Sequence, residues 1–569
     1  MSVNVDNEDD IDNRLFEIED ISQFAAMTPT GQYILTDDIE IGGRWTPIPI
    51  GSGSNNIFSG NFYGNGKTIT FSGNYPDNLP NYGIFGRIEN AIIRDLEVVY
   101  NKTVEIYAGS GEKNAGGLVG LMTGNSRLIN CVVRGAGENV VFDHRSENGT
   151  VNIGGMVGAI REGQISNCFS ELNVRGKKTL GIQSMHTGGL VGAYYSSMSI
   201  VNCYSKGNVV LENNIHSAAG GLIGYDTATP NIRECFAKGN VTAFTITGGT
   251  LFIGGLLGLT SAEIENSYAT GNVKATNNNG TIQAGGLIGS FSNSIINSYA
   301  TGNVKVTAEE GTAHLPYYYG CVNVGGLIGL SSGNVNKCWA KGNVKVERES
   351  DGVITIHAGG LIGTVEPSNI VKTIRDCYAL GDITIDHNSS GVVGLLAGGL
   401  IGFNSSNRSG SATFIHPIPI FDSFAEGNVK IKSGSIWTPY SIAAGGIVGW
   451  TDNNIDNIIA LGKRITASRD GNATALFAAY RILGNGPVSR AYALDEMQIG
   501  TSTGGYNATV ITNPVTNGNN NGADVTLERT KEASFWTGAG STMGWSSDIW
   551  DTTGVEVRGY PLLRGVGGQ

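Results

Sequence analysis

The most constraining feature of this sequence is a repeat built from two short blocks. The first block is Gly-Gly followed by two aliphatic residues and Gly. A second block follows each copy, as "INSYATGNV" does at 296–304. Successive first blocks lie 31 to 47 residues apart, and the residues between the blocks vary, as loops on a repeated scaffold do. The ten copies of the first block begin at Gly116, Gly154, Gly188, Gly220, Gly254, Gly285, Gly325, Gly359, Gly398 and Gly445.

The blocks have the pattern of β-strands. In "TIQAGGLIG", Ile282 and Ala284 share one face and polar Gln283 lies on the other. A helical repeat would instead need apolar residues at i, i+3, i+4 and i+7 with little glycine. We expect the face of Gln283, which carries Asn323 and His357 in other copies, to point outward. The direction of Leu287 stays open, because a bulge at Gly-Gly would reverse it.

Stacking of these units is the economical fold. Each unit offers about three short strands and cannot bury its own apolar face, whereas stacked copies can. We therefore predict an all-β parallel β-solenoid with one coil per repeat; a propeller is disfavoured because ten blades exceed the usual four to eight. The predicted regions are 1–100 (N-terminal cap and first irregular coils), 101–465 (ten repeats) and 466–569 (degenerate last coil and C-terminal cap).

Both ends carry signals of caps. Asp20 followed by Gln23 predicts a capped short helix. Near the other end, Tyr492 falls in the repeat position of an aromatic residue. We expect Trp536, Trp545 and Trp550 to seal the final coil rather than to bind a ligand.

Six cysteines occupy one repeat position, which Ser267, Ser298 and Ser423 fill in other copies. No Cys-x-x-Cys or Cys/His spacing is present, and serine replaces cysteine freely, so we expect small buried residues rather than metal ligands or disulfides. The six are Cys131, Cys168, Cys203, Cys235, Cys338 and Cys377.

An aromatic residue follows the cysteine or serine in most copies and should face the opposite way. One interpretation is an outer aromatic stripe that offers a platform for sugars. The other is that the rings stack on each other or lie beneath a covering loop. The candidate stripe comprises Tyr204, Phe236, Tyr268, Tyr299, Trp339 and Tyr378.

An asparagine usually precedes the cysteine or serine and suits a turn, because asparagine tolerates a left-handed φ. Glu234, Asp376 and Asp422 replace it in three copies. Glycoside hydrolysis needs two carboxylates about 5–9.5 Å apart, and only Asp376 and Asp422 belong to neighbouring coils. No HExxH motif is present and the histidines lack ligand spacing, so we predict no catalytic residue, no metal site and no cofactor.

Composition narrows the partners further. The net charge is −12 without a basic block, which argues against nucleic acid and anionic membranes as partners. No apolar run is long enough to span a bilayer. The first residues lack the apolar core of a signal peptide, so the chain is either cytosolic or a segment whose export signal has been removed.

The two blocks resemble the GLUG-motif repeat, named for Gly-Leu-aliphatic-Gly. The resemblance covers about Gly116 to Gly462, and the segments around Trp45 and Tyr560 resemble those that flank such repeats. The repeat occurs in secreted and cell-surface bacterial proteins, including adhesin-like proteins and IgA-cleaving zinc metallopeptidases. The resemblance implies a right-handed parallel β-helix at or outside a bacterial cell, and it implies no activity.

We therefore expect a non-catalytic, monomeric surface or secreted protein, an adhesin or ligand-presenting scaffold for a glycan or a host protein. One alternative is a carbohydrate-active β-helix enzyme, a polysaccharide lyase or glycosidase. Another is the non-catalytic region of a larger secreted peptidase. The insert with Tyr317, Tyr318 and Tyr319 is the first candidate for ligand contact.

Overall fold

A computed structural model gives the structure of the protein. It describes residues 15–48, 57–146, 149–178, 183–213, 216–245, 249–278, 280–309, 321–350, 354–388, 393–404, 416–434, 442–470, 477–483, 487–503 and 520–569.

The chain forms two compact units of parallel β-structure. Unit 1 comprises Met1–Thr245 and Gly255–Glu263, and unit 2 comprises Ile246–Gly254 and Ile264–Gln569. The fold is nearly all β, with 56% strand and 4% helix, and it forms β-solenoid turns, about 12 in the chain, of roughly 34 residues each. The predicted parallel β-solenoid is confirmed.

Each regular coil contains five short strands rather than the three predicted. In unit 2 one coil consists of β36 (Gly280–Gly285), β37 (Ile288–Phe291), β38 (Ser294–Ile296), β39 (Tyr299–Ala300) and β40 (Val304–Glu309). The prediction was wrong at two places. The chain turns a corner at Gly286 and Leu287, and it breaks the next strand at Asn297, where φ is 53°.

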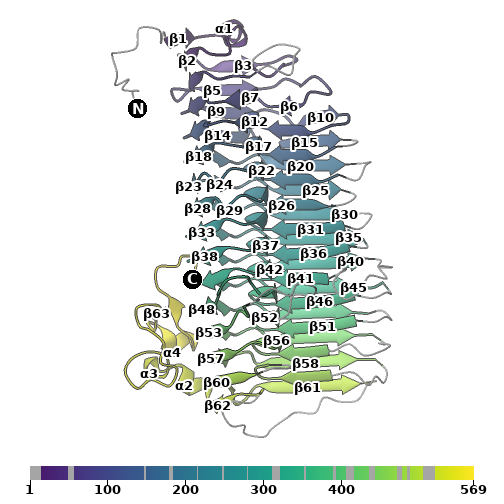
Figure 1. Ribbon diagram of the computed structural model, residues 1–569, viewed down its shortest axis with the longest axis vertical. Helices are drawn as coiled ribbons and strands as arrows, with labels where there is room; N and C mark the ends of the chain where they lie inside the picture. Colours follow the sequence, from purple (N-terminus) through teal and green to yellow (C-terminus); the bar gives the residue numbers. More distant parts are fainter. Residues whose placement is uncertain are drawn as a thin grey trace. The chain divides into compact units, whose positions relative to one another are not determined.

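Equivalent residues of successive coils lie in register. Ile282 and Ala284 of β36 pair with Val322 and Val324 of β41 (Cys321–Gly325). All four side chains are fully buried, as is Leu287, so the leucine row belongs to the core. Figure 1 shows β36, β41, β46 (Ile354–Gly359) and β51 (Val393–Gly398) of unit 2 stacked in this way.

The Gly-Gly corner brings the outer faces of two sheets together. The Thr364 hydroxyl, on β47 (Ile362–Val365), donates to the Asn323 side chain at 2.6 Å and lies 2.8 Å from His357 Nδ1. Asn323 and His357 are therefore on the outward face, as predicted, but the corner almost encloses them. A Cβ on Gly329 would lie 2.5 Å from the backbone nitrogen of Ala284. Glycine is needed there because the two backbones approach too closely for a side chain.

Unit 1 repeats the same coil. One of its turns consists of β21 (Met185–Gly188), β22 (Val191–Tyr194), β23 (Ile200–Val201), β24 (Tyr204–Ser205) and β25 (Val209–Asn213). The predicted capped helix is present as α1 (Ile21–Ala25), where the Asp20 side chain accepts from the backbone N–H of Ser22 and Gln23. None of the helices in the described parts of the chain has the length and apolar character that crossing a bilayer requires.

The C-terminal residues of unit 2 lie against the side of its coils. They form α2 (Leu527–Thr530), α3 (Ala533–Trp536), β63 (Trp550–Asp551), α4 (Val555–Arg558) and β64 (Leu562–Leu563), next to β48 (Ile374–Arg375), β53 (Ile420–Ala425) and β57 (Ile455–Ala460) (Figure 1). Before this segment, β60 (Val488–Leu494) continues the stack, with Tyr492 in register with Ile459. Tyr492 therefore occupies the position predicted for it.

Candidate functional site

The aromatic residues form stacked ladders in both units. In unit 1, Phe169, Tyr204 and Phe236 stack with ring centroids 4.5 and 4.6 Å apart and with nearly parallel planes. Each ring is half-buried. Lys206 Nζ lies 5.1 Å from the Tyr204 ring centroid and Lys238 Nζ lies 5.3 Å from that of Phe236.

In unit 2 the ladder contains Tyr268, Tyr299, Trp339, Tyr378 and Phe424, with interplanar angles of 4 to 5°. Tyr268 and Tyr299 are half-buried, whereas the other three are fully buried. Trp339 and Tyr378 are therefore not part of an outer stripe, which was one of the two interpretations of the pattern.

The C-terminal segment covers the buried part of this ladder. The Trp550 ring centroid lies 5.9 Å from that of Phe424 and 6.3 Å from that of Tyr378, and the Tyr378 hydroxyl donates to Gln569 Oε1 at 2.8 Å. Trp536 and Trp545 also contact Phe424. These tryptophans seal the side of the coils, where the sequence predicted that they seal the last coil.

Ring stacking changes what the ladder can bind. A sugar packs its apolar face against the face of an aromatic ring, but here each inner ring uses both faces on its neighbours. The half-exposed rings present their edges to solvent. The ladder is therefore mainly a stacking device of the scaffold, which was the second interpretation of the pattern.

The carboxylates considered for catalysis are engaged in structural contacts. The Arg375 guanidinium pairs with Asp376 at 3.2 Å and with Asp422 at 2.9 Å. Trp550 Nε1 donates to Asp376 Oδ1 at 3.3 Å, and burial raises the pKa of Asp376. Glu234 lies in unit 1 and, like the two aspartates, holds a left-handed turn with φ of 56°. Neither Asp376 nor Asp422 is presented as a free acid or base.

The cysteine row has a local role that the sequence did not reveal. Cys203 Sγ donates to the carbonyl oxygen of Val201 at 3.3 Å, and Ser298 Oγ donates to that of Ile296 at 2.9 Å. In each case the residue between donor and acceptor has a left-handed φ. Cysteine and serine therefore replace each other because both close the same tight turn from inside the core. All six cysteines of this row are free and buried.

Two expectations about ligands have different outcomes. Tyr317, Tyr318 and Tyr319 lie outside the described residues. Within the described ranges, no group of three or more His, Cys, Asp or Glu side chains is arranged to hold a metal ion.

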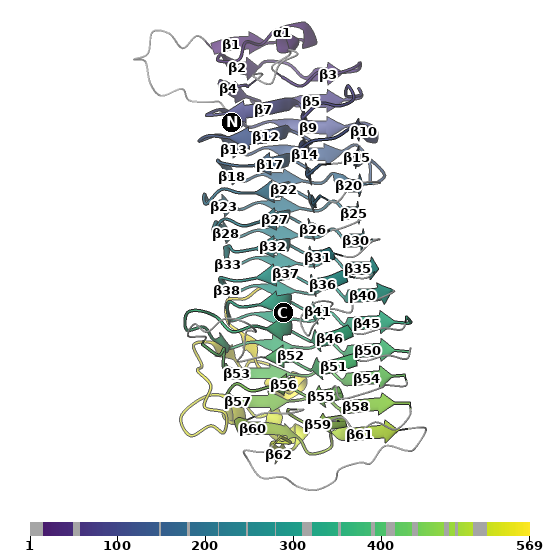
Figure 2. The ribbon, with the colours of Figure 1, turned by 45° about the vertical axis from the view of Figure 1, so that its right-hand side comes forward.

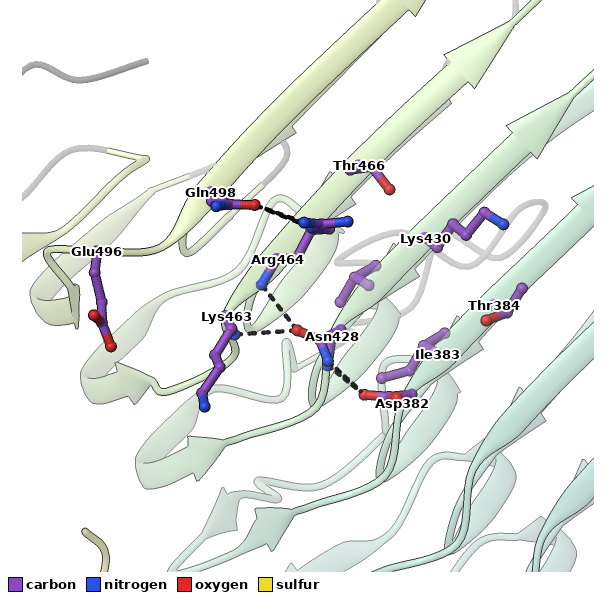
Figure 3. Close-up of a pocket in the computed structure, with 11 residues that line it drawn as sticks. Asp382, Ile383, Thr384, Asn428, Lys430, Lys463, Arg464, Thr466, Glu496 and Gln498 are labelled. Carbon is purple, nitrogen blue, oxygen red and sulfur yellow. Dashed lines mark hydrogen bonds between the residues drawn. The ribbon is translucent and has the colours of Figure 1, made fainter. Parts of the chain in front are cut away.

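A hollow in the outer face of unit 2 is a candidate site (Figure 3). It has a volume of about 750 Å³. It lies where four adjacent strands begin, and Figure 2 shows these strands one after another along the stack. The strands are β50 (Ile383–His387), β54 (Val429–Ser433), β58 (Arg464–Arg469) and β61 (Gln498–Thr503).

A chain of hydrogen bonds fixes one side of the hollow (Figure 3). The Asn428 backbone N–H and side-chain amide donate to Asp382 Oδ1 at 2.8 and 3.0 Å. Asn428 Oδ1 in turn accepts from the backbone N–H of Lys463 and of Arg464 at 3.1 and 2.8 Å. The Arg464 side chain donates to Gln498 Oε1 at 2.8 Å.

One in-register row of residues crosses the four strands at the hollow. It consists of Thr384, Lys430, Thr466 and Gly500. The lysine therefore stands between two threonines, and the last position has no side chain. The sequence repeat did not indicate this site. Alignment of the third strand of each repeat would have placed Arg464 beside Gln498, but it would not have shown a hollow.

Comparisons of the chain with protein-family models, with curated proteins and with solved structures found no match.

Proposed function

We propose that this protein is a non-catalytic scaffold that binds a polysaccharide at the hollow in unit 2, on the surface of a cell or outside it. The supporting observation is the lining of the hollow. Thr384, Thr466, Asn428 and Gln498 provide hydroxyl and amide groups, which are the groups that hydrogen-bond sugars, and Asp382 adds a carboxylate acceptor.

Preorganisation favours binding by such a surface. Each of β50, β54 and β58 is hydrogen-bonded to a strand on both sides, and the Asn428 bonds hold the adjoining corner. Binding therefore orders little protein chain, which keeps the entropic cost low.

The scaffold role is also consistent with the resemblance to the GLUG-motif repeat, from which the proposed surface or secreted location comes. The carboxylates that would favour an enzyme, Asp376 and Asp422, share Arg375, and Asp376 is covered by Trp550. We therefore favour binding over hydrolysis or elimination.

A glycan array with the purified chain tests this proposal, together with assays for reducing and unsaturated sugars on each bound polysaccharide. We expect binding without release of either product. The variant Thr384→Val/Thr466→Val should weaken binding several-fold, whereas Thr276→Val/Thr307→Val, on the same sheet of unit 2 but outside the hollow, should not. Product release would overturn the non-catalytic role, and the absence of glycan binding would overturn the scaffold proposal.

A further inference from the structure

Three cations line the hollow in unit 2, and one of them, Lys463, interacts electrostatically with Glu426. The three are Lys430, Lys463 and Arg464, and among the described residues none of them has a carboxylate within 4 Å. Arg464 donates only to the neutral side chain of Gln498 in the contacts that fix it. Lys430 and Arg464 are both exposed and come from neighbouring strands.

Several other cations on the outer faces of strands are held in ion pairs. Lys305 and Lys345 share Glu347, at 2.8 and 2.7 Å, and Arg175 and Lys177 of unit 1 share Glu212. The chain as a whole carries a net charge of −12. Cations that form no ion pair closer than 4 Å among the described residues, on an acidic protein, favour an anionic ligand.

The two acidic residues of the hollow further limit the class of anionic ligand that it can bind. Asp382 and Glu496 also line it, so its lining residues carry a formal charge of only +1. Asp382 Oδ1 already accepts two hydrogen bonds from Asn428. A densely sulfated chain would face these carboxylates with many charges. A sugar acid has one carboxylate for the cations and several hydroxyls for Asp382, Glu496 and the threonines.

We propose that the ligand is a polysaccharide rich in uronic acid, whose carboxylates are bound by Arg464, Lys430 and Lys463. This inference rests on the proposed function. The planar guanidinium of Arg464 suits a carboxylate, and the lysines act as point charges on either side of it along the chain. Three strand spacings of about 4.8 Å give the hollow a length of about 14 Å, which accommodates a short run of sugar units.

Titration calorimetry and biolayer interferometry in calcium-free buffer test the inference with polygalacturonate, heparin, dextran and poly-glutamate as probes. We expect binding to polygalacturonate that weakens as salt rises. Lys430→Gln/Lys463→Gln/Arg464→Gln should lose about tenfold or more in affinity. The control Lys274→Gln/Lys305→Gln/Lys341→Gln removes the same charge from unit 2 outside the hollow and should change affinity less than about threefold.

Each outcome decides between the two proposals. If both triple variants lose the same affinity for polygalacturonate, or if the variant in the hollow loses none, the inference is overturned. The proposed function then stands, because the protein still binds a glycan. Binding of dextran alone also overturns the inference. Tighter binding of heparin than of polygalacturonate overturns the assignment to uronic acid, and equal binding of poly-glutamate overturns the assignment to a sugar. No binding of any polysaccharide overturns the proposed function as well. Unchanged melting temperatures of both variants establish that folding is not the cause.

Discussion

Asp226 in unit 1 places a buried carboxyl where the repeat normally has an uncharged residue. It is in register with Tyr194 and is fully buried. Its Oδ2 accepts from the Thr260 hydroxyl at 2.7 Å and from the Ser261 N–H at 3.3 Å, and its Oδ1 accepts from the Ala228 N–H at 3.0 Å. Burial nevertheless raises the pKa of Asp226 from 3.8 to about 7, because these donors offset only part of the lost hydration.

The sign of the effect on stability follows from the raised pKa. The folded protein holds the proton of the Asp226 carboxyl more tightly than the unfolded chain does. The stabilisation that this proton gives the folded state is therefore complete below about pH 4. It is lost as the pH rises through about 7. The difference between pKa values of 3.8 and about 7 corresponds to about 4 kcal/mol. Asp226→Asn keeps a neutral group at every pH and removes this loss.

Urea unfolding of the wild type and of Asp226→Asn at pH 4 and pH 8.5 measures the effect. Other titrating groups cancel in the comparison of the two proteins. We expect the variant to gain about 4 kcal/mol relative to the wild type between the two pH values, on top of a constant loss of about 1 kcal/mol for an altered hydrogen bond. Hydrogen exchange of the Ala228 amide reports the same change locally.

The control is Asp77→Asn, which neutralises an exposed carboxyl of unit 1. It should not reproduce the gain expected for Asp226→Asn between the two pH values. Parallel pH profiles for the wild type and Asp226→Asn would refute the reasoning, because a carboxyl with an ordinary pKa would then occupy this site.

Three further predictions concern the scaffold. Cys203→Ser should change the free energy of unfolding by less than about 1 kcal/mol, because serine closes the same turn at Ser298. Cys203→Val leaves the Val201 carbonyl without this donor and should lower the free energy of unfolding by about 1–3 kcal/mol, measured by thermal unfolding. Equal losses in the two variants would contradict this role of the side chain. Gly286→Ala should cost about 1–3 kcal/mol, since the new methyl would overlap the Gly326 carbonyl, while Gly43→Ala, with open space around it, should not lower the melting temperature. Trp550→Ala should expose the C-terminal segment to limited proteolysis and leave the coils intact, and unchanged cleavage would show that the other contacts suffice.

The sequence repeat predicted the coil because stacked coils need the same kind of residue at each repeat position. Ile282, Ala284 and Ser298 recur as equivalents in other coils, since each must fit above and below its own equivalent in a parallel stack. The left-handed turn at Asn297 was readable for the same reason. The corner at Gly286 was not, because the spacing of two glycines does not distinguish a bulge within a strand from a turn between two sheets.

The sequence repeat did not predict contacts between segments that lie far apart in the sequence. Trp550 reaches Asp376, which lies 174 residues earlier, and no repeat records that contact. The tryptophans were predicted to seal the final coil, and this was wrong, because the surface that they cover depends on the path of the chain after the last coil.

The residues of the hollow lie at positions that folding leaves free. A side chain on the outer face of β54 or β58 meets no core neighbour, so its identity has little effect on the stack. Several outer cations nevertheless have an acidic neighbour in an adjacent strand, as Lys305 has Glu347, and this arrangement relieves the repulsion between like charges in register. Lys430 and Arg464 have no such ion pair among the described residues, and Arg464 donates to the neutral side chain of Gln498. The proposed ligand therefore rests on these two cations at the hollow, whereas ring stacking accounts for the more regular aromatic ladder.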